Sequence, residues 1–336
     1  NEKVFVITEK SYEYSNNYKN KLKNLAKLYY SKININNKKK ENFVTKKFIR
    51  MINKFIKDNK INRNSIDYIG FSGQTIFHNP FKKKSIQLGS CKEIQKKIKI
   101  KVVGNFRDND VQNGGQGAPI GAFYHKYIIN KVSNNSAILN IGGISNISLI
   151  KDKKLIAFDM GPGNSLIDDL MLFFYKKNFD FNGKKAFKGK KNNKLLLEFK
   201  KDIFFKNHYP KSLDREYFKK YYDKLKLINN SNAITTASYM TIEGIIMGLT
   251  TINYSIDKII LTGGGRKNHF IVKKLTNILK KRNIKIELID NLGLDGDFLE
   301  AQAFGYLAIR SLLKLPISLP TTTGVKKPLT GGKIYK

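Results

Sequence analysis

The pattern of hydrophobic and polar positions predicts short buried strands that alternate with amphipathic helices. Apolar runs of a few residues predict strands at KVFVI (3–7), IDYIGFSG (66–73), IKVVG (100–104), KIILTGGG (258–265) and IKIEL (284–288). The stretch AILNIGGISNISLI (137–150) predicts two strands joined by a Gly-Gly turn.

Apolar residues at helical spacing predict the helices. In residues 41–59 these are Phe43, Phe48, Met51, Ile52, Phe55 and Ile56. Further helices are predicted at 119–130, where Pro119 suits a first turn, and at 232–253, 268–281 and 295–314. Residues 155–174 predict a strand, a tight loop and a helix, residues 176–194 a polar surface loop, and residues 315–335 an extended tail rich in Pro and Gly.

This alternation in both halves of the chain predicts an α/β fold. Glycine-rich loops follow several strand ends, and in open α/β sheets ligands bind beyond the carboxyl ends of the strands. Two halves, each with such a loop, indicate two lobes with a cleft between them. We expect an N-terminal lobe of residues 1–135 completed by 314–336, and a C-terminal nucleotide-binding lobe of residues 136–313.

Composition narrows the class of protein. The chain has 336 residues, of which 41% are hydrophobic, which is typical of a globular protein. The one cysteine, Cys91, fits a reducing compartment, so we expect a cytoplasmic protein. No apolar run approaches the roughly 20 residues that span a bilayer.

The formal net charge of +37 has two interpretations. Clustered Lys and Arg bind polyanions by neutralising phosphates. Alternatively, the charge is background composition, because Lys, Asn and Ile are abundant together and the basic residues scatter along the chain without a nucleic-acid motif. We favour composition and expect neither nucleic-acid nor membrane binding, although the charge should steer acidic small molecules toward the protein.

Several loops carry candidate chemistry. Gly142 and Gly143 either serve a hairpin that requires positive φ or expose amides to phosphate, with Ser145 and Asn146 as added donors. Gly263, Gly264 and Gly265 follow a strand directly, which favours a nucleotide lying against the backbone over a plain turn. Asn268 is the expected N-cap of the next helix.

Three carboxylates have competing roles. Asp159 stands at a strand end before two glycines, where a site role and a structural role are both open. Glu300 either closes a capping box with Asp297 or contacts a ligand. Asp110 lies in FRDNDVQNGGQGAP (106–119), a predicted loop whose glycines allow another group to approach the backbone closely. Arg107 is near enough in the chain to bind Asp110 or a phosphate. A carboxylate held there could act as a general base.

At these residues the sequence resembles the anhydro-N-acetylmuramic acid kinase family. The motifs that carry the resemblance run in family order: GQTIFHNP (73–80), FRDNDVQNGGQGAP (106–119), LNIGGISN (139–146), FDMGPGNSLIDD (158–169), PKSLDREYF (210–218), LTGGGRKN (261–268), DGDFLEAQAFGYLA (295–308) and LPTTTGVKKPLTGGKIY (319–335).

The resemblance implies a two-lobed, ribonuclease H-like fold of the type found in actin, hexokinase and heat-shock chaperone ATPases. It implies ATP with Mg²⁺, no protein metal ligands, and a possible homodimer. The implied reaction hydrolyses the 1,6-anhydro ring of anhydro-N-acetylmuramic acid and phosphorylates O6, giving N-acetylmuramic acid 6-phosphate in peptidoglycan recycling.

The same resemblance assigns roles to residues. Asp110 matches the catalytic base that deprotonates the attacking water. Within the matching motifs we predict sugar contacts from Gln74, His78, Arg107, Gln116, Asp159 and Glu300. We predict nucleotide contacts from Gly142, Gly143, Asn146, Gly161, Gly163, Gly263, Gly264, Gly265 and Asn268.

Two departures from the family pattern stand out. The Gly-, Ser- and Thr-rich phosphate loop with which members begin is not found around KVFVITEK, so we expect a chain that starts after it. Ser72 and Asn105 replace the usual His and Asp, which concerns substrate contacts more than the fold. Alternatives to an active kinase are a fragment that binds sugar or nucleotide without turnover, and a basic polyanion-binding protein.

Overall fold

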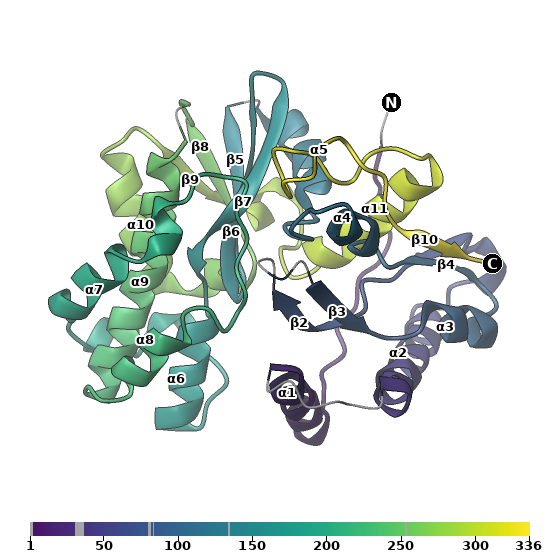
Figure 1. Cartoon of the computed structure of the whole chain (residues 1–336), viewed down its shortest axis with the longest axis horizontal. Helices are drawn as coiled ribbons and strands as arrows, with labels where there is room; N and C mark the ends of the chain where they lie inside the picture. Colours follow the sequence, from purple (N-terminus) through teal and green to yellow (C-terminus); the bar gives the residue numbers. More distant parts are fainter. Residues whose placement is uncertain (1–2, 31–36, 80–81, 83, 134, 253) are drawn as a thin grey trace. The chain divides into compact units, whose positions relative to one another are not determined.

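The computed structural model describes residues 3–30, 37–79, 82, 84–133, 135–252 and 254–336 (Figure 1). The chain divides into two compact units. Unit 1 comprises residues 1–121, 300–320 and 325–336, and unit 2 comprises residues 122–299 and 321–324. Within the described ranges, no helix is both long and apolar enough to cross a membrane.

Unit 2 is built on a five-stranded sheet in the order β7-β6-β5-β8-β9. The strands are β5 (Ser136–Ile141), β6 (Ile144–Lys151), β7 (Lys154–Pro162), β8 (Lys258–Thr262) and β9 (Lys285–Leu288). Strand β6 lies between β7 and β5 and runs antiparallel to both, whereas β8 and β9 are parallel to β5. This order and these directions are those of a ribonuclease H-like sheet, which confirms the expected fold class.

Alternate residues of these strands form the core of unit 2. Ala137, Leu139 and Ile141 of β5 are fully buried in one large hydrophobic cluster. This cluster lies between the sheet and α9 (Asn230–Thr250), which contacts β7. Four helices pack around α9: α6 (Ser165–Tyr175), α7 (Asn193–Lys200), α8 (Lys219–Leu225) and α10 (His269–Lys280). The opposite face of the sheet is covered by α5 (Ala122–Val132), which contacts β5, β6 and β7 (Figure 1).

Unit 1 has a three-stranded sheet in the order β1-β4-β10 and a separate pair, β2-β3. The strands are β1 (Tyr68–Gly70), β2 (Gln74–Asn79), β3 (Lys84–Leu88), β4 (Lys101–Gly104) and β10 (Lys333–Tyr335), the last antiparallel to β4. The helices are α1 (Asn16–Tyr30), α2 (Asn37–Asp58), α3 (Cys91–Ile98), α4 (Asp108–Gln112) and α11 (Leu299–Leu312). Short 3₁₀ turns complete the chain: η1 (Arg63–Ser65), η2 (Phe181–Gly183), η3 (Ala186–Lys188), η4 (Ile203–Lys206), η5 (Gly264–Lys267) and η6 (Ile289–Leu292).

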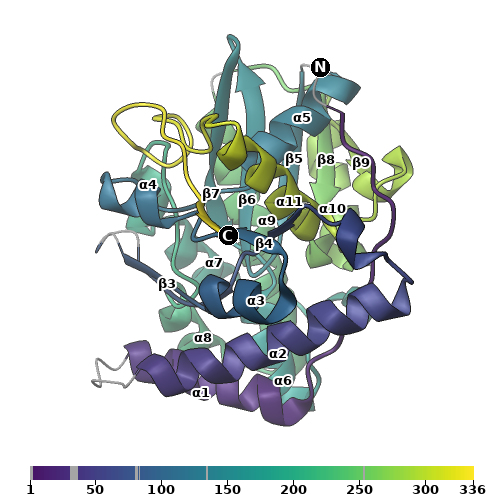
Figure 2. The same ribbon diagram turned by 90° about the vertical axis from the view of Figure 1, so that its right-hand side faces the viewer.

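The core of unit 1 forms on both faces of β4, where Val102 and Val103 are fully buried. Val102 belongs to a cluster with Ile94 and Ile98 of α3, against which α2 packs. Figure 2 shows α1 running beside α2, and Leu22 and Leu25 of α1 pack near Val44 of α2.

Most predicted elements are present. The structure confirms the strands near 66–73, 100–104, 137–150, 258–265 and 284–288, the strand, loop and helix of 155–174, the largely irregular stretch after α6, and the helices near 41–59, 232–253 and 268–281. The helices expected to begin at residues 119 and 295 begin at Ala122 and Leu299. Elements that the sequence did not reveal are short or rich in lysine: α1, β2, β3, α3, α4, α7, α8 and β10.

The strand predicted at residues 3–7 is wrong. The segment has no regular secondary structure, and the side chains of Phe5 and Ile7 are 80% and 94% exposed. A strand requires a neighbouring strand for its backbone hydrogen bonds, and among the described residues none pairs with this segment.

The expected lobe boundaries need correction on two helices. We expected α5 in the N-terminal lobe, but it packs on β5, β6 and β7 and belongs to unit 2. We expected α11 in the C-terminal lobe, but nearly all of it belongs to unit 1. In unit 1, Phe304 of α11 packs near Phe106. A Cβ on Gly70 would overlap the carbonyl oxygen of Phe304.

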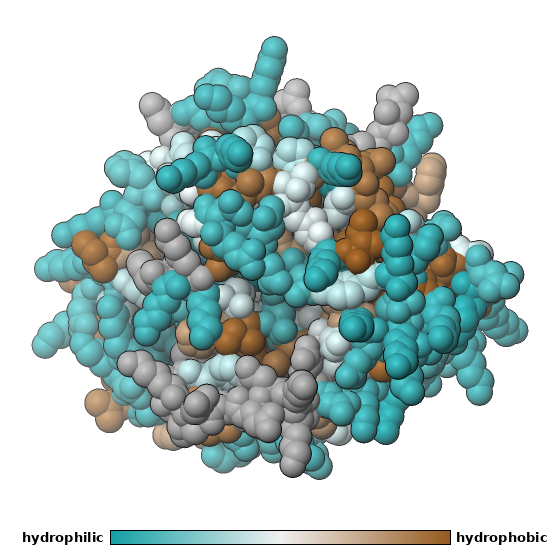
Figure 3. Space-filling view, turned by 45° about the vertical axis from the view of Figure 1, so that its right-hand side comes forward, coloured by the Kyte–Doolittle hydropathy of each residue, from teal (hydrophilic) through white to brown (hydrophobic). Residues whose placement is uncertain are grey.

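The lysines take part in ordinary packing. On the face shown in Figure 3, hydrophilic side chains surround smaller hydrophobic areas. Lysine ammonium groups also lie over aromatic rings, as with Lys131 and Tyr127 at 4.6 Å and Lys185 and Tyr175 at 4.1 Å. These contacts favour the composition interpretation of the charge.

His125 on α5 predicts a pH-dependent stability of unit 2. Its Nδ1 lies 2.8 Å from Ser148 Oγ, and burial lowers the pKa of its imidazole to about 4. Unfolding restores the ordinary pKa of about 6.5, so the unfolded chain binds the proton more tightly. The histidine should therefore reduce the free energy of unfolding as the pH falls from about 6.5 to about 4, with a limiting slope of about 1.4 kcal/mol per pH unit.

We expect His125→Gln, which can still bond to Ser148, to lose this contribution. Urea unfolding of both proteins, followed by circular dichroism at pH 7.5 and pH 5, measures the difference. An equal loss of stability between the two pH values in both proteins would contradict a buried neutral imidazole.

Candidate active site

Asp110 is held in place by its own chain segment within unit 1. It lies in the short helix α4, rather than in the loop we expected, and is 1% exposed. Its Oδ1 accepts a 2.6 Å hydrogen bond from Gly117 N, and its carbonyl accepts a 2.8 Å bond from Gly115 N. A backbone donor aimed at a buried carboxylate fixes the orientation of that carboxylate.

The glycines after Asp110 are required by this arrangement. A Cβ on Gly115 would overlap Asp110 Oδ1 and lie 2.6 Å from Val325 Cγ1. Gly117 has φ +73°, in the left-handed region that favours glycine, and a Cβ there would lie 2.8 Å from Val111 Cγ2. The glycine backbone therefore surrounds the Asp110 carboxylate. This packing is a structural reason for glycine at positions 115 and 117, and the sequence did not reveal it.

His78 and Arg107 lie beside the same backbone. A Cβ built on Gly117 would lie 3.6 Å from His78 Cε1 and 3.8 Å from Arg107 Cβ. Both ring nitrogens of His78 are buried and have no hydrogen-bond partner among the described residues. Burial, and secondarily the charge of Arg107, lowers the pKa of His78 to about 3, so the imidazole is neutral at pH 7. The structure thus groups Asp110, Arg107 and His78 around Gly117.

The remaining predicted residues of unit 1 lie at its surface or half-buried. Gln74 begins β2 and Gln116 stands between the two wrapping glycines, both half-buried. Glu300 is exposed on the first turn of α11. The capping box expected with Asp297 is wrong, because α11 begins at Leu299 and Arg266 Nη1 bonds to the Asp297 carboxylate at 2.8 Å.

The two residues that differ from the family pattern, Asn105 and Ser72, have local partners. Asn105 has φ +58°, which asparagine tolerates, and its Nδ2 donates to Asp108 Oδ2 at 2.8 Å. Ser72 Oγ donates to the carbonyl of Gly73 at 3.2 Å.

In unit 2, the hairpin of Gly142 and Gly143 does not use glycine for its turn. Neither residue has a left-handed φ, and Cβ atoms there would meet nothing closer than 3.6 and 3.9 Å. The structural explanation by positive φ is therefore wrong. The hairpin carbonyls instead accept bonds from the start of α6, from Asn164 N to Gly142 O at 2.7 Å and from Gly163 N to Gly143 O at 2.9 Å.

Other predicted residues nearby have packing roles. A Cβ on Gly163 would overlap Gly142 O, and one on Gly161 would lie 3.2 Å from Gly244 Cα of α9. Asp159 is buried, and its Oδ2 accepts a 2.7 Å bond from Leu213 N, which anchors residues 211–213. Asn146 is half-buried in β6, whereas the Ser145 hydroxyl, expected as a phosphate donor, donates to Gly161 O at 3.1 Å.

The loop after β8 contains two glycines fixed by packing and one that faces outward. Gly263 has φ +73°, and its Cβ would overlap Asn140 Oδ1 and lie 2.7 Å from Ile141 O. A Cβ on Gly265 would lie 2.6 Å from Ile141 Cβ. Gly264 is exposed, and a Cβ there would meet only Asn164 Nδ2, at 3.6 Å. A ligand can therefore approach the backbone at Gly264.

Asn268 caps α10, as predicted. Its Oδ1 accepts bonds from Phe270 N at 3.1 Å and Ile271 N at 3.3 Å. The cap occupies this oxygen, so any nucleotide contact from Asn268 remains a prediction.

Comparison with known proteins decides the family. The family model described as anhydro-N-acetylmuramic acid kinase matches residues 1–336. The chain belongs to the anhydro-N-acetylmuramic acid kinase family. As a member it is a sugar kinase, a phosphotransferase.

Individual relatives agree. The anhydro-N-acetylmuramic acid kinase of Zymomonas mobilis is 37% identical over 297 residues, which cover 88% of this kinase and 80% of that protein. The protein of the same name from Pelagibacter ubique is 40% identical over 290 residues, covering 81% and 74%.

Solved structures are more distant. The kinase is similar to a ligand-bound xylulose kinase from Lactobacillus acidophilus, with a TM-score of 0.35 and 15% identity over 75% of this chain and 51% of that one. It is also similar to an activator of 2-hydroxyisocaproyl-CoA dehydratase from Clostridium difficile, with a TM-score of 0.36 and 12% identity over 69% and 88% of the two chains. Likenesses of this size do not bear on function.

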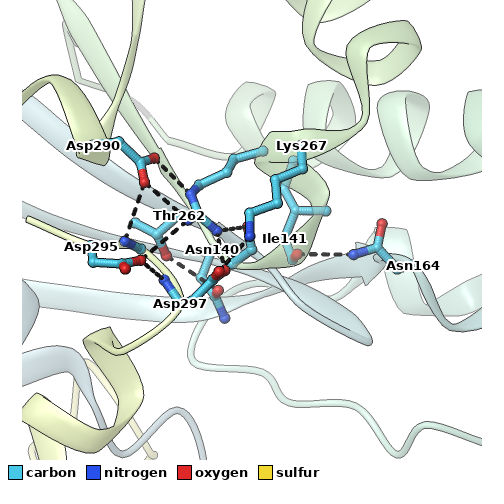
Figure 4. Close-up of polar contacts among 11 residues, drawn as sticks. Asn140, Ile141, Asn164, Thr262, Lys267, Asp290, Asp295 and Asp297 are labelled. Atoms are coloured by element: carbon cyan, nitrogen blue, oxygen red, sulfur yellow. Dashed lines mark hydrogen bonds and ion pairs between the residues drawn. The ribbon is translucent and has the colours of Figure 1, made fainter. Parts of the chain in front are cut away.

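Three residues of the kinase escaped the sequence prediction. Arg266, which follows Gly265 in the chain, is buried, and Asn164 Nδ2 donates to Ile141 O at 3.2 Å (Figure 4). Lys211 Nζ donates to Asn207 O at 2.8 Å, and burial lowers the pKa of its ammonium to about 8 although Asp159 opposes the shift. All three residues lie inside family motifs, but a single polar residue in a motif does not reveal that its side chain is buried.

The packing of the kinase's glycine loop predicts unequal effects of two neighbouring substitutions. Gly265→Ala should destabilise unit 2 by about 2 kcal/mol, because its Cβ overlaps Ile141. Gly264→Ala should change stability by less than about 0.5 kcal/mol, because its Cβ meets only ordinary contact. Urea unfolding of both variants measures the difference. Equal effects would contradict the described packing of the loop.

Proposed function

We propose that this family member hydrolyses the 1,6-anhydro ring of anhydro-N-acetylmuramic acid and phosphorylates O6 with ATP, giving N-acetylmuramic acid 6-phosphate. The observation that carries the proposal is a buried carboxylate, oriented by a backbone amide, beside an imidazole without partners. The carboxylate lies in the motif that matches the family's catalytic aspartate (106–119), and the imidazole lies in the motif GQTIFHNP (73–80).

Asp110 acts as the general base. A carboxylate offers about four acceptor sites, so the bond from Gly117 leaves it able to accept a proton from water. The deprotonated water oxygen bonds to C1 of the sugar as the bond from C1 to O6 breaks. The electron pair of that bond stays on O6, which takes the γ-phosphoryl group while ADP leaves.

His78 and Arg107 bind the sugar. A buried neutral imidazole without partners loses hydrogen bonds on folding, and a ligand with hydroxyl or amide groups restores them. Arg107 supplies a cation suited to the lactyl carboxylate of the sugar. We propose Gln74, Gln116, Asp159 and Glu300 as further contacts, of which Asp159 acts through the segment that it anchors.

The residues of unit 2 fit a nucleotide. At Gly142, Gly143 and Gly264 a Cβ would meet nothing closer than 3.6 Å, so the backbone there is accessible to phosphate oxygens or a base. Gly161, Gly163, Gly263 and Gly265 shape these loops by packing, and Asn146 and Asn268 flank them.

Mg²⁺ would neutralise charge on the transferring phosphoryl group. In the described residues no group of three or more His, Cys, Asp or Glu side chains could hold a metal ion. Mg²⁺ characteristically binds through substrate phosphates, water and one or two carboxylates, so it does not need such a group.

The one cysteine, Cys91, is a buried thiol, and together with the requirement for ATP it supports a cytoplasmic location. A homodimer is part of the proposal, and sedimentation velocity measures it directly.

Asp110→Asn tests the role of the base. It should lower kcat by about a factor of 10² to 10⁴ while the KM for ATP changes by less than about threefold. Mass spectrometry of the phosphorylated sugar and ADP release give both quantities. The matched control is Asp108→Asn, two residues away on the exposed side of α4, where the carboxylate bonds to Asn105. Similar kcat values for Asp110→Asn and the control would exclude the base role.

Gly264→Ala tests the nucleotide loop. A methyl group on this exposed backbone should raise the KM for ATP by about tenfold and leave the KM for the sugar unchanged. Gly305→Ala is the control, since that exposed glycine of α11 has open space around its Cβ and lies outside the loops. An unchanged KM for ATP in Gly264→Ala would remove this loop from the nucleotide site.

A further inference from the structure

Arg266, the residue after the Gly263–Gly265 loop, is the buried centre of an ionic cluster whose carboxylates, those of Asp290, Asp295 and Asp297, are partly exposed. The residue is 4% exposed. Its Nε and Nη2 donate to the two carboxylate oxygens of Asp290 at 2.7 and 3.0 Å, and its Nη1 donates to Asp297 Oδ1 at 2.8 Å. Lys267 pairs with the other oxygen of Asp297, on the exposed side.

The same guanidinium also holds the loop backbone. Its Nη1 donates to Gly263 O at 3.1 Å. The loop is therefore fixed on two sides, by Ile141 and Asn140 of β5 on one and by Arg266 on the other. Gly264, the outward-facing glycine, is the next residue in the chain.

The segment 290–297 is shaped to fit this guanidinium. Gly296 passes so closely that a Cβ there would overlap Arg266 Nε and lie 2.6 Å from its Cζ. Asp295 approaches Nη2 at 3.6 Å. The hydrogen bonds from Arg266 also lower the pKa of Asp290, so this carboxylate stays charged at acidic pH.

Stability alone is a weak reason for this cluster. The carboxylates of Asp290, Asp295 and Asp297 are 41%, 46% and 44% exposed, and ion pairs with exposed partners contribute little to stability because solvent screens them. A planar guanidinium instead provides geometric specificity, because its N–H donors point in fixed directions and hold several acceptors in place at once. Here the acceptors are two carboxylates and the carbonyl of the nucleotide loop.

We propose that Arg266 is a positioning residue for ATP: through Gly263 O, Asp290 and Asp297 it fixes the loop conformation that presents Gly264 to the nucleotide. The inference rests on the proposed nucleotide site in unit 2. Arg266 itself does not touch ATP in this scheme.

Two substitutions alter the cluster in different ways. Arg266→Lys keeps a positive charge but cannot form the fork, and should raise the Kd for ATP by about tenfold. Asp290→Asn keeps Arg266 and one acceptor oxygen, and should raise the Kd by a smaller factor. In both variants the KM for the sugar should stay within about twofold of the wild type.

The control separates positioning from stability. Asp202 is a buried carboxylate of unit 2, whose partners are Phe204 N, Tyr217, Tyr221 and Lys220, none of them in the loop. Asp202→Asn should lower the Tm without changing the Kd for ATP. A purely structural role of Arg266 would make its variants behave like this control.

Isothermal titration calorimetry with ATP and Mg²⁺ on the full chain measures Kd without requiring turnover. A wild type that binds ATP but forms no phosphorylated sugar would refute the proposed reaction and leave this inference intact. If Arg266→Lys does not fold, Asp290→Asn decides alone. A Kd within twofold of the wild type in the folded variants, or a wild type that binds no ATP, would overturn the positioning role.

Discussion

The close approach of the Gly263–Gly265 loop to the end of β5 is the constraint on which the proposed nucleotide site of this kinase depends. Parallel pairing of β5 and β8 places both carboxyl ends at one edge of the sheet. There the loop fits against Ile141 and Asn140 only because Gly263 and Gly265 lack side chains. The hairpin of Gly142 and Gly143 leaves the same strand and is tied to the start of α6. Sheet pairing thus brings two glycine loops, 120 residues apart, to one edge.

A similar constraint operates at the proposed sugar site in unit 1. Gly115 and Gly117 are needed because their backbone surrounds the Asp110 carboxylate, and the amide of Gly117 donates to it. Glycine at both positions allows the polar backbone to lie closer to the Asp110 carboxylate than a residue with a Cβ would permit. The residues that give each proposed site its shape are therefore mostly glycines, which have no side chain to contact a ligand. In the proposed sugar site, the polar side chains are those of His78 and Arg107.

Much of the fold could be predicted from the sequence, and the failures have physical causes. Strands such as 100–104 and 258–262 are continuous apolar runs because both faces are buried, which makes them easy to recognise. KVFVI at 3–7 has the same composition but no pairing strand among the described residues, and composition cannot supply a partner. The capping box at Asp297 failed because Arg266, distant in sequence, bonds to that carboxylate. The lobe boundaries failed because helix packing, which assigned α5 and α11, is a tertiary property.

The sequence by itself determined the α/β class, the family through its ordered motifs, and the candidate positions Asp110, Gly142–Gly143 and Gly263–Gly265. It did so because backbone periodicity and glycine placement are local properties. Only the tertiary structure distinguished among the glycines: Gly263 and Gly265 are fixed by packing, whereas Gly264 is exposed. It also showed that Gly117 orients Asp110 and that Arg266 holds the loop. These roles arise from contacts between residues far apart in the chain, or from the way a segment folds back on itself. The distances between the contacting atoms are set only when the core packs.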